Sequence, residues 1–357
     1  MTAKSHILRN NISNPTHSEN PPHNTANRKR YLFIDIAKGI AIILVVIGHF
    51  YPDSSPFYYE CIHRIIYTFH MPLFMMASGF LYIATRHEVS YLSFVRKKTL
   101  RLMIPYIATS IIILTIKLLT QGQMTVDHPV DLHSFIECLY LPAAGYFLWF
   151  LWALWIMFLI VYNFTTRSSR ILLAVIALAL YLCPIQFPSI FCLEQFRRMF
   201  IYFMGGIIFY DWKHYFSSLS INTFGCIITI LFLFGEMAYI ALGFNRYLEI
   251  ILPWLGIATT LFVGMLIQKN THSLIYRSII RISSYSFFIY LFHTTFMGPA
   301  KGILMKLPFF INSSGISFLI LAISVVTMGI IAPILTDRYL IRKSSVLSFI
   351  FGQKPIR

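Results

Sequence analysis

The residues best suited to chemistry stand in one apolar stretch near the N-terminus, FIDIAKGIAIILVVIGHF, which holds Asp35, Lys38 and His49. An ionisable group inside a membrane segment is costly to bury, so each one marks a functional-site hypothesis. Lys38 and His49 are eleven residues apart, which on a helix places them within about 20° of one face and about 16 Å apart along the axis. Asp35 falls on that face too. A lysine at the inner end suits a phosphate, and histidine is a general base near neutral pH. The alternative is that Lys38 reaches lipid headgroups and His49 is an interfacial residue.

A second stretch, FHMPLFMMASGFLY, carries His70 just before Met71-Pro72. Proline bends a membrane helix and is tolerated where the helix lines a cavity, so Pro72 is compatible with a cavity beside His70. Taken alone, His70 is also explained as a packing or hydrogen-bonding residue. The connection between this stretch and the next apolar one is the most basic segment of the chain, with Arg86, Arg96, Lys97, Lys98 and Arg101. It either binds a polyphosphate cofactor or only determines the topology. Weaker intramembrane candidates are Lys117, Glu236 and His293.

These residues must be positioned by membrane helices, because 57% of the chain is hydrophobic and only 12% is charged. A soluble domain carries about 25% charged residues. The apolar residues come in blocks long enough to cross a hydrocarbon core of about 30 Å. We therefore predict an all-α membrane protein, a bundle of about ten transmembrane helices occupying residues 31–340. The predicted spans are Phe33–Phe50, Ile65–Ala84, Leu102–Thr120, Tyr146–Asn163, Ile171–Phe187, Arg198–Tyr210, Ile221–Phe244, Ile250–Gln268, Ser284–Ala300 and Gly315–Leu335.

Charge predicts the orientation of this bundle. With a cytoplasmic N-terminus, the inward segments hold 21 of the 29 lysines and arginines, and the outward segments hold 6. This positive-inside pattern requires an even number of spans, so both termini are predicted to be cytoplasmic in a multi-pass protein of the plasma (inner) membrane. Residues 1–30 are predicted to be a disordered cytoplasmic tail, and residues 341–357 a basic one. The net charge of +16 is then explained by topology and lipid contact, and indicates no nucleic-acid partner.

The five cysteines follow no metal-binding spacing, and no metal site is expected. Four of them fall near predicted outward ends: Cys61, Cys138, Cys183 and Cys192. They are interpreted either as buried thiols or as partners in a disulfide.

Several stretches together resemble the integral-membrane acyltransferase family 3 of polysaccharide O-acetylases, and most of all its fucose 4-O-acetylase-like branch. The matching stretches lie between about residues 30 and 340, in an order and spacing that make the set specific. They are Asp35-Ile36-Ala37-Lys38-Gly39, Val45-Val46-Ile47-Gly48-His49, Phe69-His70-Met71-Pro72-Leu73-Phe74, Ser78-Gly79-Phe80, Arg96 to Arg101 with Ile104-Pro105-Tyr106, Leu148-Trp149-Phe150-Leu151, and Tyr285-Ser286 through Tyr290-Leu291-Phe292-His293. Most members carry arginine where this chain has Lys38, so the contact with phosphate would be a point charge.

The resemblance implies transfer of an acyl group, usually acetyl, from cytoplasmic acyl-CoA (acetyl-CoA) to a sugar hydroxyl on the outer side. The acceptor would be a cell-surface polysaccharide or its lipid-linked precursor. Lys38 and the Arg96–Arg101 run would bind the phosphates of CoA. His49 would act as general base or as acyl carrier, and the two alternatives stay open. His70 would orient the acceptor or hold an oxyanion, while Arg64 would contact sugar.

Two other classes of function fit part of the pattern. Buried His, Lys and Glu along a polar path are also typical of a proton-coupled transporter or flippase of a glycan intermediate. A non-catalytic partner of a polysaccharide assembly would leave Lys38 and His49 dispensable. Neither the acceptor sugar nor the oligomeric state is encoded in a recognisable motif.

Overall fold

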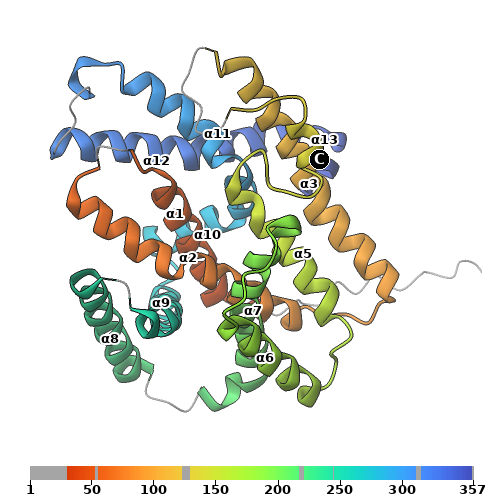
Figure 1. Cartoon of the computed structure of the whole chain (residues 1–357). Helices are drawn as coiled ribbons and strands as arrows, with labels where there is room; N and C mark the ends of the chain where they lie inside the picture. The colour runs from red at the N-terminus through yellow and green to blue at the C-terminus, as the bar shows by residue number, and fades with distance from the viewer. Residues whose placement is uncertain are drawn as a thin grey trace, which may run out of the picture. The chain divides into compact units, whose positions relative to one another are not determined.

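The fold is built from helices. A computed structural model describes residues 30–52, 55–122, 129–216, 221–243, 245–310 and 315–355, without side chains for 214–216 and 221, and every regular element in these ranges is helical (Figure 1). The predicted disordered tail lies outside the described residues except for Arg30. The longer helices are α1 (Leu32–His49), α2 (Phe57–Ala84), α3 (Tyr91–Thr120), α5 (Trp149–Val161), α6 (Arg167–Leu182), α7 (Leu193–Phe216), α8 (Ile221–Leu242), α9 (Arg246–Ile267), α10 (Leu274–Ser284), α11 (Ser286–Leu304) and α12 (Ile316–Thr336). Shorter ones are α4 (Ser134–Glu137), α13 (Ser345–Ile350), the 3-10 turns η1 (Tyr146–Leu148), η2 (Ile190–Cys192) and η3 (Pro308–Phe310), and the π-turn η4 (Asp337–Ile341).

The length and the apolar composition of several of these helices are those of membrane-spanning helices, which indicates a membrane protein. Within the described ranges, six are long and apolar enough to span a bilayer: Leu32–His49, Phe57–Ala84, Tyr91–Thr120, Asn222–Leu242, Arg246–Ile267 and Ile316–Ile341. Each of the ten predicted segments contains a helix, although α6 ends at Leu182 and not at Phe187, because Pro184 follows, and Phe244 lies outside the described residues. The count of ten spans and the cytoplasmic placement of the ends remain predictions.

Several helices run past the bounds expected from hydropathy. The α2 helix starts at Phe57 instead of Ile65, and α3 starts at Tyr91 instead of Leu102. Hydropathy marks only the part of a helix that crosses hydrocarbon, whereas the backbone hydrogen bonds continue into the headgroup region. The basic run Arg96–Arg101 is therefore helical. The helix α10 was not predicted, because eleven amphipathic residues are too few to cross a bilayer.

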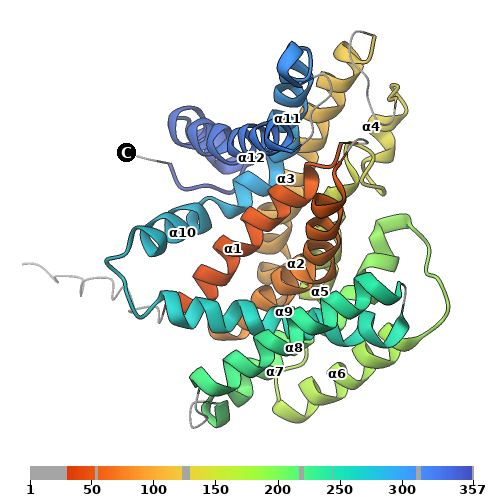
Figure 2. The ribbon, with the colours of Figure 1, turned by 90° about the vertical axis from the view of Figure 1, so that its left-hand side faces the viewer.

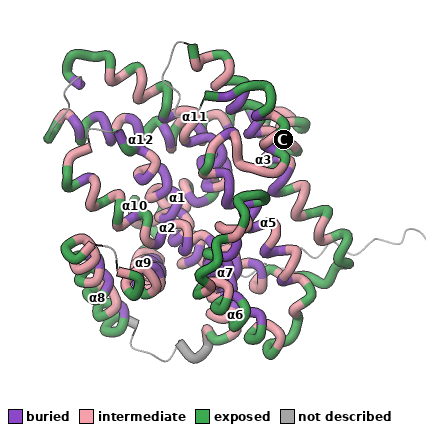
Figure 3. The backbone as a smooth tube through the Cα atoms, in the orientation of Figure 1, coloured by how far each residue is buried: buried purple, intermediate pink, exposed green. Residues whose placement is uncertain are grey.

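The α1 helix is the centre of the bundle. It packs against α2, α9, α10, α11 and α12, and α2 in turn packs most closely against α7 (Figure 2). The buried residues are concentrated along the same helices, since the tube in Figure 3 carries purple stretches along α1, α2 and α7 and is largely pink and green along α8. The α1 helix bearing His49 is thus enclosed by protein on several sides, while α8 presents most of its surface outward.

The C-terminal segment is folded onto the bundle, and the cysteines are not paired in the described structure. The predicted basic tail contains α13, which packs against α3, and Phe351 there is buried. All five cysteines are free thiols; Cys138 and Cys192 are buried, and Cys226 is exposed. The structure therefore agrees with the interpretation of Cys138 and Cys192 as buried thiols.

Candidate functional site

A cavity of about 1480 Å³ lies at the end of the bundle that holds the predicted outward helix termini. His49 from α1, His70 from α2 and Tyr290 from α11 all line it. Its wall contains many polar side chains. The titratable and hydroxyl-bearing lining residues are His49, Tyr51, Glu60, His63, Arg64, Tyr67, Thr68, His70, Lys117, Thr120, Tyr146, Tyr181, Glu194, Arg198, Tyr202, Tyr239, Glu249, Tyr290, Thr294, Thr295, Lys301 and Lys306. The cavity brings together side chains that the sequence scatters over more than 250 positions.

His49 is the last residue of α1 and is half-buried in the cavity wall. Its ring centroid lies 4.8 Å from that of His293, 5.9 Å from that of Phe147 and 6.4 Å from that of Tyr67. One side of the imidazole is therefore packed in protein while the residue borders the cavity. A histidine in this position can exchange a proton with a bound ligand.

His70 and His293 are both fully enclosed and both tied to helix backbone. The Nδ1 atom of His70 lies 2.7 Å from the Ile66 carbonyl oxygen. The Nδ1 atom of His293 lies 3.1 Å from the Ile289 oxygen and 2.9 Å from the Tyr290 oxygen. A carbonyl oxygen only accepts hydrogen bonds, so Nδ1 carries the hydrogen in both rings and Nε2 holds a lone pair. His70 lines the cavity, whereas His293 touches His49 from behind the cavity wall.

Two aromatic residues of the site were missed by the sequence analysis. The ring of His63 stacks between those of Tyr51 and Tyr67, with centroids 4.2 Å apart in each pair. Tyr67 also meets the ring of His70, at 4.9 Å. The signal was present, because residues 63, 67 and 70 follow the i, i+4, i+7 spacing of one helix face. The predicted span began only at Ile65, so it left out His63 and with it the first position of this spacing.

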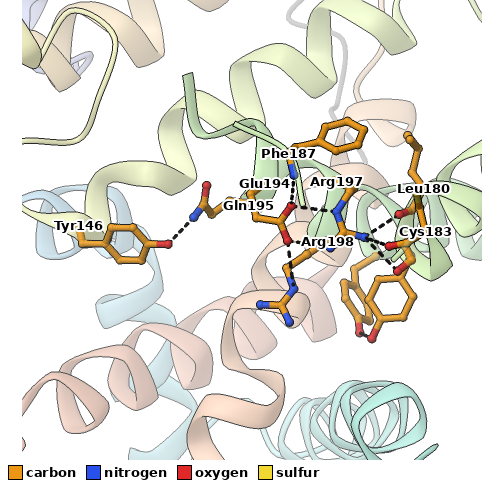
Figure 4. A network of polar contacts seen from close by, with 10 residues as sticks. Tyr146, Leu180, Cys183, Phe187, Glu194, Gln195, Arg197 and Arg198 are labelled. Carbon is orange, nitrogen blue, oxygen red and sulfur yellow. Dashed lines mark hydrogen bonds and ion pairs between the residues drawn. The ribbon is translucent and has the colours of Figure 1, made fainter. Parts of the chain in front are cut away.

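The wall formed by α6 and α7 is braced by a buried ion pair (Figure 4). Arg197 donates to both carboxylate oxygens of Glu194, at 2.7 and 2.9 Å, and to the carbonyl oxygens of Leu180, Tyr181 and Cys183 at the end of α6. The Arg197 guanidinium thereby lowers the pKa of the Glu194 carboxyl below its ordinary value. These bonds hold Glu194 and its neighbour Arg198 in the lining. Gln195 also donates to the Tyr146 hydroxyl across the wall.

The predicted donor-site residues lie away from this cavity. Asp35 and Lys38 are half-buried in the first turns of α1, and neither borders the cavity. In the basic run, Arg96, Lys97 and Arg101 are exposed. Lys98 differs, because its Nζ atom lies 3.4 Å from the ring centroid of Phe158. The ammonium of Lys98 is thus occupied by a cation–π contact, and the exposed members of the run are better placed to meet a soluble cofactor.

The other residues proposed from sequence divide between the cavity and the core. Arg64 and Lys117 line the cavity. Glu236 does not: only 1% of it is exposed, and neither of its carboxylate oxygens makes a hydrogen bond within the described structure. The described residues also contain no cluster of three or more His, Cys, Asp or Glu side chains able to hold a metal ion.

Replacing Glu236 with glutamine is expected to stabilise the protein, because an amide avoids the cost of burying an unpaired carboxylate. We expect a gain of about 1 kcal/mol, which corresponds to roughly 2–4 °C in the unfolding midpoint of a domain of about 150–250 residues. Thermal unfolding in detergent measures this shift, with Glu88→Gln at an exposed position as the matched control. A lower midpoint for Glu236→Gln would show that the carboxylate has a stabilising partner.

Comparison with known proteins adds a family and two relatives. The family model described as "Acyltransferase domain" matches residues 31–336. Nodulation protein NolL of Sinorhizobium fredii is 39% identical over 98 residues, which are 26% of each chain. Nodulation protein NolL of Mesorhizobium japonicum is 30% identical over 222 residues, which are 57% of each chain. The chain thus matches less than two thirds of the length of these relatives. No solved structure matches.

Proposed function

The chain belongs to the acyltransferase family whose model it matches, and from that premise we propose that it is a membrane O-acyltransferase. It moves an acyl group, in the first instance acetyl, from cytoplasmic acyl-CoA to a sugar hydroxyl of a cell-surface polysaccharide or of its lipid-linked precursor. The observation that carries the proposal is the placement of His49. It stands in the wall of the large cavity, on the same helix that carries Lys38 near its other end.

The donor enters from the cytoplasmic side in this proposal. Lys38, together with Arg96, Lys97 and Arg101, supplies positive charge for the phosphates of CoA. Because α1 is continuous from Leu32 to His49, Lys38 and His49 are separated by about 16 Å along its axis. The pantetheine arm of CoA spans a comparable length, so the thioester approaches His49 while the phosphates stay at the inner end. Lys98 stays a member of this donor-site prediction, although its ammonium packs on Phe158.

At the reacting centre, His49 acts as general base or as acyl carrier. As general base, a ring nitrogen of His49 takes the proton of the sugar hydroxyl while the oxygen attacks the thioester carbonyl. The carbon–sulfur bond then breaks, and the departing thiolate takes the proton back from His49. As carrier, the same nitrogen attacks the thioester carbonyl, the carbon–sulfur bond breaks, and CoA leaves as a thiolate while His49 holds the acyl group as an acyl-imidazolium. The sugar hydroxyl then attacks that acyl group, the bond from the acyl carbon to the ring nitrogen breaks, and the hydroxyl proton passes to the thiolate. Both routes return His49 to its neutral form.

The acceptor occupies the cavity in this proposal. Its volume of about 1480 Å³ exceeds the roughly 300–1,000 Å³ of ordinary small-molecule sites, which favours a glycan of several residues. Seven tyrosines line it: Tyr51, Tyr67, Tyr146, Tyr181, Tyr202, Tyr239 and Tyr290. Such rings offer apolar faces and hydroxyl groups, both of which suit sugars. His70 and Arg64, which both line the cavity, contact the acceptor in this proposal.

The proposal is tested with inverted membrane vesicles that contain this chain and receive acetyl-CoA labelled in the acetyl group. Label that enters glycan only when the intact chain is present is the expected result, and it also reports transfer from the cytoplasmic to the outer side. If acetyl-CoA and longer acyl-CoA donors all leave glycan unlabelled, the acyltransferase proposal fails. Export of an unmodified glycan in the same vesicles would then support the transporter alternative.

Reversing the charge at Lys38 is expected to weaken binding of the donor. Lys38→Glu places a carboxylate against the phosphates of CoA, so we expect KM for acetyl-CoA to rise by about 10-fold or more, which corresponds to at least about 1.4 kcal/mol. Steady-state transfer at varied acetyl-CoA measures this, with Lys343→Glu in the C-terminal segment as the control. An unchanged KM would move the phosphate contacts to Arg96, Lys97 and Arg101.

A further inference from the structure

His293 is a buried histidine with one nitrogen bound and the other unused. Its side chain is 0% exposed on α11. Nδ1 donates toward the Ile289 and Tyr290 carbonyl oxygens, so the ring can neither flip nor change tautomer without losing both contacts. The opposite atom, Nε2, has no hydrogen-bond partner within the described structure. A buried acceptor without a partner is costly, so its retention calls for an explanation.

The nearest chemically active neighbour of His293 is His49. The two rings have centroids 4.8 Å apart and are inclined by 56°. Phe147 closes the remaining space, since its ring centroid lies 5.9 Å from that of His49 and 5.1 Å from that of His293. The Tyr290 hydroxyl donates to the Phe147 carbonyl oxygen, and this bond fixes the position of Phe147 beside the two histidines. The two imidazoles are therefore confined against each other, His293 in the core and His49 at the border of the cavity.

We propose that His293 is a positioning residue whose Nε2 lone pair accepts a hydrogen bond from one ring nitrogen of His49. This inference rests on the proposed function of His49. Because His293 is locked with its hydrogen on Nδ1, it can only accept at Nε2, and His49 must present its own N–H there. The other nitrogen of His49 is then unprotonated and faces the cavity, ready to take the proton of the acceptor hydroxyl or to attack the thioester.

The proposed hydrogen bond from His49 to Nε2 of His293 also stabilises the protonated form of His49 during the reaction. When His49 takes a proton from the acceptor hydroxyl, both of its nitrogens carry hydrogen, and the one directed at His293 becomes a charge-assisted donor. His293 keeps its own proton throughout, so the proton passes only from the hydroxyl to His49 and then to the departing thiolate. The role matches that of a carboxylate that orients a catalytic histidine, with a neutral ring in its place.

Two substitutions separate this role from simple packing. Asparagine at position 293 can keep an amide donor near the place of Nδ1 but offers no acceptor near the place of Nε2. Glutamine is one methylene longer and can place its carbonyl oxygen near Nε2. A histidine that only fills space and ties the helix backbone would be replaced about equally well by either residue.

The experiment measures transfer from labelled acetyl-CoA by the full chain and its His293→Asn and His293→Gln variants, with folding checked by monodisperse elution in detergent. We expect kcat to fall by about 100-fold or more in His293→Asn, to stay within about 10-fold of the parent in His293→Gln, and KM for acetyl-CoA to stay unchanged in both. Equal kcat values of the two folded variants, whether high or low, would overturn the proposal. Full activity of His49→Ala would instead show that His49 has no part in the reaction, and a parent chain that transfers no label would show that the proposed function itself fails.

A second measurement applies if either variant does not fold. The tautomer of His49 is read in the full chain by nitrogen NMR on labelled histidine in detergent, with His49→Asn used to assign its signals. A single tautomer whose N–H signal shows a hydrogen bond supports the proposal. Exchange of His49 between its two tautomers overturns it.

Discussion

Replacement of His49 with alanine is expected to abolish acyl transfer while the protein still folds. The imidazole is the only protein side chain that accepts a proton or an acyl group in the proposed reaction, and general acid–base catalysis alone contributes about 10²–10⁴-fold to a rate. We therefore expect kcat to fall by at least about 100-fold. Transfer of label from acetyl-CoA into glycan, normalised to the amount of protein in the vesicles, measures the effect.

The matched control for His49→Ala is His133→Ala. His133 lies on the surface beside Glu137, where 62% of its side chain is exposed, so its loss removes a histidine without touching the cavity. This variant should transfer label at the rate of the parent protein. If His49→Ala and His133→Ala are equally active, His49 has no part in the chemistry, and another group in the cavity, such as His63 or His70, must be sought.

Replacement of Gly79 with alanine is expected to prevent the α2 and α7 helices from packing. A Cβ atom added at Gly79 would lie 1.9 Å from the Phe203 carbonyl oxygen, and one added at Gly206 would lie 1.9 Å from the Met76 carbonyl oxygen. The backbones of the two helices are in direct contact, as small residues allow in membrane bundles. Since helix backbone cannot yield like a flexible side chain, we expect a loss of about 3 kcal/mol or more.

Thermal unfolding and elution profile in detergent measure this loss, and Gly298→Ala is the matched control. A Cβ atom at Gly298 meets nothing within 4 Å, so the same methyl group on α11 should leave the fold intact. Activity should disappear with the fold in Gly79→Ala, because α2 carries His63, Tyr67 and His70. An unfolding midpoint for Gly79→Ala equal to that of Gly298→Ala would show that α2 and α7 separate without cost.

Sequence and structure agree where the physical cause is local. Apolar blocks of about twenty residues must be helical in a bilayer, because unpaired backbone groups are too costly there, and each of the ten predicted segments contains a helix. The position of His49 at the C-terminal end of α1 also followed from counting residues along one helix. The resemblance of the motifs to an acyltransferase family was confirmed by the family match over residues 31–336.

Sequence and structure differ where the environment depends on other helices. Lys98 lies in the basic run and was assigned to phosphate, yet its ammonium rests on Phe158 of α5, 60 positions away in the chain. Glu236 was considered as a site residue, yet it is buried away from the cavity lining. Hydropathy reports the average cost of placing a residue in lipid. It carries no information about which side chain of another helix packs against that residue.

The sequence by itself determined that this chain is a helical membrane protein, which segments are helical, and that α1 carries a lysine and a histidine on one face. Only the tertiary structure decided that His293 of α11 lies against His49 of α1 and that one large cavity joins His49 to the stack of His63 and Tyr67. The reason is physical. A helix forms from hydrogen bonds between residues four apart, whereas a site forms where separate helices pack, and close contacts such as that of Gly79 with Phe203 set that packing.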